Sequence, residues 1–145
     1  MKTNITAQID ALWQGQAVDF AACLDVFPVL EQAKTTLQDP VYHGEGDVWT
    51  HTQMVVSELL ALADFQAASE SEQRVLFLAA LLHDVAKYRT TVINEQGRIS
   101  QPGHSKKGAL DARILLWELG LPFAEREAVC NLIAVHQVPD RKSVV

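Results

Sequence analysis

The chain has 145 residues, of which 48% are hydrophobic and 21% charged, with only 7 glycines and 5 prolines. This length and composition fit one folded domain with a sizeable core and exclude a disordered or fibrous chain. The formal charge of -6 argues against a broad nucleic-acid-binding surface, because phosphate contacts need clustered Lys and Arg. A small phosphate ester can still bind at a local positive site.

The cysteines and the N-terminus indicate the compartment. Cys23 and Cys130 do not form a CxxC pair, so we expect buried thiols in a reducing environment. The first residues are too polar for a signal peptide, and no apolar run approaches the ~18 residues of a membrane span. The sequence therefore predicts a soluble cytoplasmic protein that does not associate with membranes.

Helical patterns predominate in the first half of the chain. Residues 4–13 carry apolar residues at helical spacing, and residues 19–34 do the same around Pro28, which should end one short helix and open another. Residues 39–47 are rich in turn formers and predict a loop. A long amphipathic helix is predicted from residue 48 to about residue 63.

The second half continues the helical pattern. We expect a central helix that is capped by Ser71 and runs through His83 and Asp84 to about Lys87. Residues 88–103 lose all periodicity and predict a small hairpin or a mobile loop. Two further helices are expected, from His104 to a stop at Gly120 and over residues 123–136.

These patterns predict an all-α fold, a compact bundle of about six helices in one domain over residues 1–145. N-terminal helices occupy residues 1–38, and residues 39–139 form the core that carries the candidate site. The last helix has an apolar face with no following helix to cover it, which predicts a homodimer, a neighbouring domain or missing sequence at the C-terminus.

The stretch VLFLAALLHDVAK, residues 75–87, ends an apolar run with the adjacent pair His83 and Asp84. Burying a charge costs several kcal/mol unless the charge is paired or holds a metal. We therefore expect a metal ion to hold Asp84.

The chain has five histidines, and all but one stand at a predicted helix end or a junction between a loop and a helix. A divalent metal needs imidazole and carboxylate donors that converge from several elements. The residues that can supply such a set are His51, His83, Asp84, His104 and His136. His43 is expected to be an ordinary loop residue, and His104 and His136 taken singly are equally compatible with helix caps.

Four short motifs carry a family resemblance: HGEGDVWTHTQMVV at 43–56, HDVAK at 83–87, GHSKKGA at 103–109 and NLIAVHQVP at 131–139. Together they resemble the HD-domain metal-dependent phosphohydrolases. The first motif is similar to the opening of the HD domain attached to bacterial CCA-adding tRNA nucleotidyltransferases. Residues 1–38 contribute nothing specific to the resemblance.

The resemblance implies a role for each matched residue. His51, His83 and Asp84 would be metal ligands, with Asp84 bridging if two ions bind, and His104 and His136 would be ligands of a second ion or contacts to phosphate. Lys87 would approach the substrate phosphate. The implied cofactor is one or two divalent ions, of Mn, Fe, Ni, Co or Zn, with Mg also compatible.

The sequence departs from the family pattern at its end. The pattern closes with an aspartate on a helix after the last histidine, whereas Asp140 is the only later carboxylate and follows Pro139 directly. Either Asp140, Asp47 or Asp111 takes the place of that aspartate, or water does, or the chain is a fragment of a longer protein.

The expected activity follows from charge. A divalent ion held by imidazoles and a carboxylate acidifies bound water and polarises a phosphoryl oxygen. Asp84 and Lys87 are the candidate catalytic residues, and the candidate phosphate contacts are Lys87, Arg89, Lys106 and Lys107, each of which can also be an ordinary surface charge. We expect hydrolysis of a nucleotide phosphomonoester or of a cyclic or linear phosphodiester such as an RNA end, with residues 88–103 as a specificity element or lid.

Two other functions are compatible with the sequence. One is a non-catalytic HD module that binds metal or nucleotide as a sensor, or as an accessory domain to a nucleotidyltransferase or kinase. The other is a plain helical interaction domain whose histidines are caps.

Overall fold

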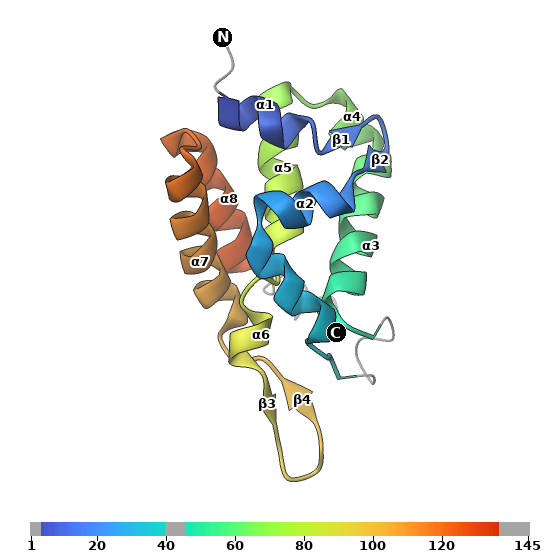
Figure 1. The fold of residues 1–145 in the computed structure, drawn as a ribbon, viewed down its shortest axis with the longest axis vertical. Coiled ribbons are helices and arrows are strands. Elements are labelled where there is room, and N and C mark those ends of the chain that lie inside the picture. Colours follow the sequence, from blue (N-terminus) through green and yellow to red (C-terminus); the bar gives the residue numbers. More distant parts are fainter. Residues whose placement is uncertain (1–3, 40–45, 137–145) are drawn as a thin grey trace.

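The computed structural model describes residues 4–39 and 46–136. Within them, eight α-helices and one 3-10 helix surround a single core, and two antiparallel pairs of two-residue strands accompany them (Figure 1). The all-α prediction is confirmed. The helices outnumber the six expected because short helical turns, such as α4 and α6, continue beyond the ends of longer ones.

The N-terminal elements are α1 (Asn4–Asp10), β1 (Trp13–Gln14), β2 (Ala17–Val18), α2 (Phe20–Val26) and the 3-10 helix η1 (Pro28–Thr35). The expected helix over 4–13 ends early, because Trp13 pairs with Val18 across a turn in which Gly15 has a φ of 58°. Trp13 then stacks on Phe77 with 4.4 Å between ring centroids. As predicted, Pro28 separates two helical segments.

The central elements are α3 (Val48–Ala61), α4 (Ala63–Ala67), α5 (Glu70–Leu82) and α6 (Lys87–Thr90). Asp47 caps α3 by accepting a hydrogen bond from the Thr50 backbone nitrogen at 2.7 Å. The cap of α5 is Ser69, two residues earlier than predicted. The prediction that this helix runs through His83 and Asp84 was also wrong, because α5 ends at Leu82 and a turn separates it from α6.

The C-terminal elements are β3 (Val92–Ile93), β4 (Ile99–Ser100), α7 (His104–Leu119) and α8 (Phe123–Val135). The two strands form the small hairpin that was one of the two predictions for residues 88–103. Gly120 ends α7 in the left-handed region at a φ of 83°, and its N–H bonds back to the carbonyl oxygens of Leu116 and Trp117.

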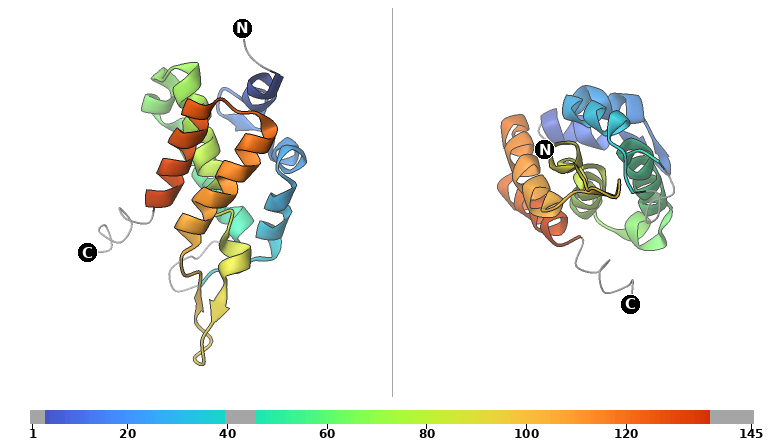
Figure 2. Two further views of the ribbon diagram at one scale, coloured as in Figure 1. Left: turned by 90° about the vertical axis from the view of Figure 1, so that its left-hand side faces the viewer. Right: turned by 90° about the horizontal axis from the view of Figure 1, so that it is seen from below.

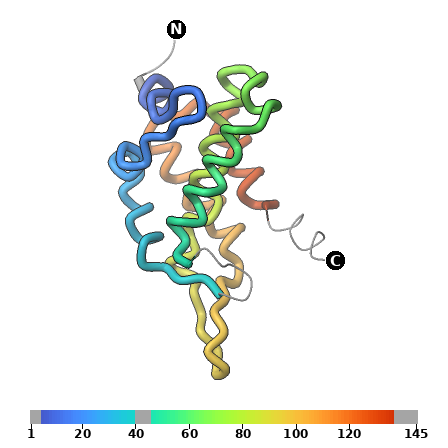
Figure 3. Tube along the Cα trace, turned by 90° about the vertical axis from the view of Figure 1, so that its right-hand side faces the viewer, coloured from blue at the N-terminus to red at the C-terminus, as the bar shows by residue number. Residues whose placement is uncertain are grey.

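Helix α5 lies at the centre, packed against α3 on one side and α8 on the other, and α7 packs against α8 (Figure 2). The apolar residues of α5 that are buried include Phe77, Leu78 and Leu82. The elements α1, α2 and η1 cover one flank, and the hairpin projects beyond one end of the bundle (Figure 3). None of the helices in the described residues has the length and hydropathy of a membrane-spanning segment.

Both cysteines are buried and free, as expected. Burial is the main reason that the pKa of Cys23 rises to about 12, with the nearby Asp19 charge adding to the rise. A thiol with such a high pKa is almost never a thiolate at neutral pH, so Cys23 acts as a packing residue.

A candidate metal centre

The end of α5 sets up the site through a tightening of the backbone. After Leu82 the chain makes 3-10-type hydrogen bonds, from Val85 N–H to the Leu82 carbonyl and from Lys87 N–H to the Asp84 carbonyl. In a 3-10 turn, side chains three residues apart eclipse each other. Asp84 and Lys87 therefore lie together, with 3.3 Å between Lys87 Nζ and Asp84 Oδ2.

Four imidazole rings converge on the Asp84 carboxylate. His83 Nε2 lies 3.0 Å and His51 Nε2 3.8 Å from Oδ2. His104 Nε2 lies 3.3 Å and His136 Nε2 3.4 Å from Oδ1. The histidines come from the start of α3, the end of α5, the start of α7 and the end of α8, helix ends that all face the hairpin end of the bundle (Figure 1).

Backbone contacts fix the tautomers of three of these rings. His83 Nδ1 lies 2.6 Å from the Ala80 carbonyl oxygen, His136 Nδ1 lies 2.6 Å from that of Ile133, and His104 Nδ1 lies 3.0 Å from that of Gln101. A carbonyl oxygen only accepts, so Nδ1 must carry the proton. In each neutral ring Nε2 then presents a lone pair, which is the arrangement of a metal-binding histidine.

The same lone pairs leave the centre short of positive charge. His104 Nε2 and His136 Nε2 face each other at 3.3 Å, and both also face a carboxylate oxygen. Acceptors at such distances repel unless a proton or a cation lies between them. Asp84 is only 4% exposed, and within the described residues its Oδ2 has no hydrogen-bond partner. This donor set therefore fits a divalent cation.

The pKa values describe the same balance of charge. Burial by itself would raise the pKa of Asp84, but when protons occupy the imidazoles in place of a cation, the His83 charge and the close nitrogens of His104 and His136 hold this pKa well below its ordinary value. Burial lowers the pKa of His83, whereas the Asp84 carboxylate raises it, and the net shift is upward. Asp84 is thus ionised at neutral pH, as a metal ligand must be.

The ligand atoms form two overlapping groups in which all atoms lie within 4.8 Å of one another. One group contains His51, His83 and Asp84, and the other contains Asp84, His104 and His136. Because Asp84 belongs to both groups, the described residues can accommodate one ion or two ions that share its carboxylate.

The predicted phosphate contacts differ in their surroundings. Lys87 is buried at 3% exposure, and its Nζ donates a hydrogen bond to Gln38 Oε1 at 2.7 Å. Arg89 is exposed and binds Asp111 through two hydrogen bonds of 2.8 and 2.9 Å. Lys106 and Lys107 are exposed in the first turn of α7. Sequence reasoning missed Gln38, because no local pattern marks it.

The carboxylates considered as substitutes for the missing aspartate are held elsewhere. Asp47 caps α3 and also accepts from the Thr50 hydroxyl, and Asp111 binds Arg89. Neither belongs to a ligand group in the described residues. Asp140 and His43 lie outside the described residues.

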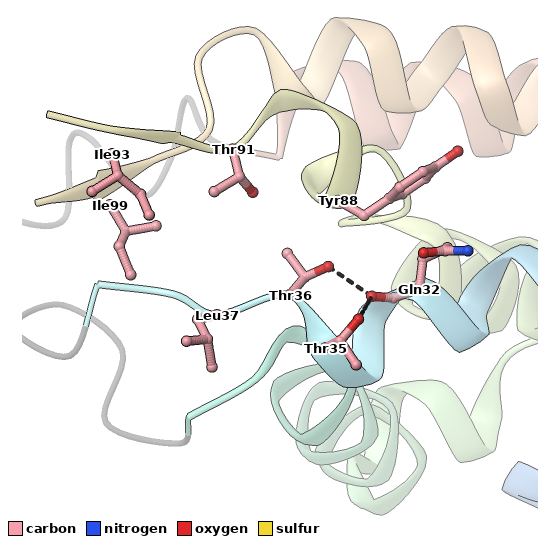
Figure 4. A pocket seen from close by; sticks show the side chains of 8 residues that line it. All are labelled: Gln32, Thr35, Thr36, Leu37, Tyr88, Thr91, Ile93 and Ile99. Carbon is pink, nitrogen blue, oxygen red and sulfur yellow. Dashed lines mark hydrogen bonds between the residues drawn. The ribbon is translucent and has the colours of Figure 1, made fainter.

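An apolar groove borders the centre. Its volume is about 510 Å³, and its lining includes His51, His83 and His136. Aliphatic side chains from α3, α5 and α8 line the rest, including the exposed Val135 at 52%. A smaller pocket of about 320 Å³ lies between η1 and the hairpin, with Tyr88 on one side and Gln32 on the other (Figure 4).

The hairpin is tied to the chain segment that precedes the site. Arg98 Nε donates to Asp39 Oδ2 at 2.6 Å, and Gln101 Nε2 donates to the Leu37 carbonyl at 3.3 Å. These contacts hold residues 37–39 against the hairpin and the residues that follow it.

The structure is thus an α-helical bundle with a buried carboxylate ringed by imidazoles that could hold a metal ion. A family model of the HD domain matches residues 48–143, more than half of the chain, and the chain belongs to the HD domain family. HD domains bind divalent metals and are generally metal-dependent phosphohydrolases. No curated protein and no solved structure matches the chain.

Proposed function

We propose that this chain is a divalent-metal-dependent phosphohydrolase whose one or two ions are held by His51, His83, Asp84, His104 and His136. One observation carries the proposal. Each oxygen of a single buried carboxylate faces two imidazole Nε2 atoms. In three of the four rings a backbone carbonyl accepts from Nδ1, so Nε2 of the neutral ring presents a lone pair. A buried cluster of acceptors of this kind is stable only around a cation or added protons.

A bound divalent ion would supply the positive charge that polarises a phosphoryl oxygen and lowers the pKa of a water molecule. The residues of the chain prepare the site for both. Asp84 provides the anionic ligand, and the fixed Nδ1 tautomers keep the imidazoles oriented. Lys87 has three N–H donors, of which one is directed to Gln38 and one faces Asp84, so among the described residues one is left for a phosphate oxygen.

The distribution of charge supports an anionic substrate. Residues 87–107 contain five Lys and Arg against one acidic residue, Glu95, although the whole chain has a net charge of -6. Arg89 and Arg98 are paired with aspartates, whereas Lys106 and Lys107 are exposed beside His104. We infer that the substrate phosphate approaches from this side, with the hairpin as the specificity element or lid.

The substrate we propose is a nucleotide phosphomonoester or a cyclic or linear phosphodiester such as an RNA end. Support comes from the likeness of residues 43–56 to the HD domain of CCA-adding enzymes, which is a resemblance of sequence alone. The acidic net charge favours a small ester or a chain end over an extended nucleic acid.

Hydrolysis of a simple phosphate ester tests the proposal. The protein, freed of metal by chelation, is loaded with Mn²⁺, Ni²⁺ or Co²⁺ and assayed with p-nitrophenyl phosphate, a 2′,3′-cyclic nucleotide and a 3′-phosphorylated oligonucleotide. We expect turnover that chelator removes and that Asp84→Asn abolishes. Asp111→Asn is the matched control, because this carboxylate binds only a surface arginine in the described residues. Metal binding without turnover on any ester would contradict the proposal.

That last outcome would favour a second function, a non-catalytic HD module that binds metal or nucleotide as a sensor or beside a nucleotidyltransferase or kinase domain. A specific observation favours it: within the described residues, Asp84 is the only carboxylate in either ligand group. The apolar groove and the exposed side chains Leu132 and Val135 on α8 are then the surface that we propose a neighbouring domain or a second copy covers.

A further inference from the structure

Three buried side-chain atoms have no hydrogen-bond partner in the described residues, and all lie in or next to the candidate centre. They are Asp84 Oδ2, Ser105 Oγ beside His104, and Gln38 Nε2. Buried polar groups are almost always hydrogen-bonded, so an exception needs an explanation, such as a catalytic role or a bound water or ion. The proposed metal would account for Asp84 Oδ2. It does not account for Gln38 Nε2, because an N–H donor does not bind a cation, and Gln38 lies outside residues 48–143 that match the HD domain.

The contacts of Gln38 determine how its amide is oriented. Its Oε1 accepts the hydrogen bond from Lys87 Nζ at 2.7 Å. An ammonium group has no acceptor, so the amide oxygen and not the nitrogen must face Lys87. Within the part of the chain that the structure describes, the NH₂ group on the same carbon is then a donor without a partner, at 3% residue exposure. It lies one hydrogen bond away from an ammonium that is itself 3.3 Å from Asp84.

We propose that Gln38 is a binding residue of the centre, whose Nε2 donates a hydrogen bond to a phosphoryl oxygen while its Oε1 positions Lys87. A neutral donor and an ammonium side by side, next to a carboxylate that can hold a cation, form a cradle for a tetrahedral oxyanion. This inference rests on the proposed function in one respect, because it requires the centre to bind phosphate.

The position of Gln38 has a structural cause. Residues 36–39 are held between α3 and the hairpin, by the Val48 N–H bond to the Thr36 carbonyl at 2.9 Å and by the Arg98 bond to Asp39. The neighbouring pocket between η1 and the hairpin is lined by Leu37 and Tyr88, the chain neighbours of Gln38 and Lys87 (Figure 4). The two residues of the cradle are thus fixed by ordered segments.

Binding of inorganic phosphate to the Mn²⁺-loaded full chain, measured by calorimetry, tests the inference. We expect Gln38→Met to raise the Kd for phosphate about ten- to hundredfold, the value of a hydrogen bond to a charged group. Gln32→Met is the control, because Gln32 is an exposed glutamine of the adjacent 3-10 helix. The Kd for Mn²⁺ should stay close to that of the wild type, whereas the Tm should fall because Met leaves the buried Lys87 ammonium without its acceptor. A merely structural role of Gln38 would lower the Tm but leave the Kd for phosphate unchanged.

A double-mutant cycle separates direct donation from action through Lys87. In the Lys87→Met background, Gln38→Met should weaken phosphate binding by about a further tenfold. No further loss would overturn the direct role of Nε2. If Gln38→Met does not fold, Gln38→Glu keeps the shape and an acceptor for Lys87 but lacks the donor, and it should also bind phosphate more weakly than its control Gln32→Glu.

The outcomes distinguish this inference from the proposed function. If the wild type hydrolyses phosphate esters and Gln38→Met binds phosphate as tightly, the inference alone fails. If the wild type binds Mn²⁺ but no phosphate, the inference and the proposed function fail together.

Discussion

Replacing Asp84 by Asn is the sharpest perturbation of the centre. The change keeps the shape of the side chain but removes the one anionic ligand that both ligand groups share. Among the described residues each group then retains a pair of imidazoles, so we expect the affinity for a divalent ion to fall by at least about 100-fold. This exceeds the 10–100-fold loss typical when a residue that hydrogen-bonds to a metal ligand is replaced.

The effect on stability can be worked out from linkage. A metal present at 100 times its Kd stabilises the folded state by about 2.7 kcal/mol. For a domain of this length each kcal/mol shifts the Tm by about 2–4 °C, so the wild type should gain about 5–11 °C with metal. After a 100-fold loss of affinity the gain is about 0.4 kcal/mol, or about 1–2 °C.

Differential scanning fluorimetry with Mn²⁺, Ni²⁺ or Co²⁺ against a chelator measures both values. The quantity compared is the shift in Tm that metal causes in each variant, so a lower Tm of metal-free Asp84→Asn does not affect the comparison. Asp111→Asn should keep the wild-type shift. An equal shift in wild type and Asp84→Asn would refute the reasoning, as would a wild type without any shift.

Three further predictions concern stability and pH. Arg74→Ala should lower the free energy of unfolding by about 2–3 kcal/mol in urea titrations, because the 5% exposed Arg74 joins Asp10 of α1 to Glu125 of α8 and its loss removes both of these ion pairs. The partly exposed Arg113, changed to Ala, should leave the urea midpoint nearly unchanged. In α7, Gly108→Ala should stabilise the protein by about 0.5–1 kcal/mol, since an added Cβ meets only ordinary contacts, the nearest at 3.5 Å. Gly120→Ala should destabilise it by about 1–2 kcal/mol, because Gly120 has a φ of 83°. In thermal unfolding, the Tm of the first variant should therefore rise and that of the second should fall. Metal affinity, measured by calorimetry, should fall at least about tenfold from pH 7.5 to pH 5.5, because protons compete for the imidazoles while Asp84, with its lowered pKa, stays ionised. Because the pKa of His83 is raised, the loss of affinity should begin closer to neutral pH. An affinity that does not change with pH would contradict the proposed ligands.

Local signals in the sequence predicted most of the helices, because capping residues and glycine stops act within a few residues. Pro28 separates two helical segments and Gly120 ends a helix, both as expected. The end of α5 was predicted wrongly. Its apolar run has good helix propensity up to Lys87, but the tightening after Leu82 depends on tertiary contacts such as the pair of Asp84 and Lys87, which propensity does not contain.

The candidate site was predictable to the extent that its residues have unusual neighbours in the sequence. An acidic residue after an apolar run marked Asp84, and histidines at helix ends marked its surroundings. Their arrangement was not predictable, because it depends on which helix ends meet. The close approach of His104 to His136 and the contact between Gln38 and Lys87 join residues 32 and 49 positions apart.

Those long-range contacts bear on where the functional unit begins. The matched family residues start at Val48, yet segments before it complete both the core and the site. Trp13 stacks on the buried Phe77 of the central helix, and Gln38 holds the ammonium that faces Asp84. Removing residues 1–47 would expose Phe77 to water and leave the buried Lys87 without its acceptor Gln38. The N-terminal segment is therefore part of the centre in a physical sense, although no motif in it resembles the family.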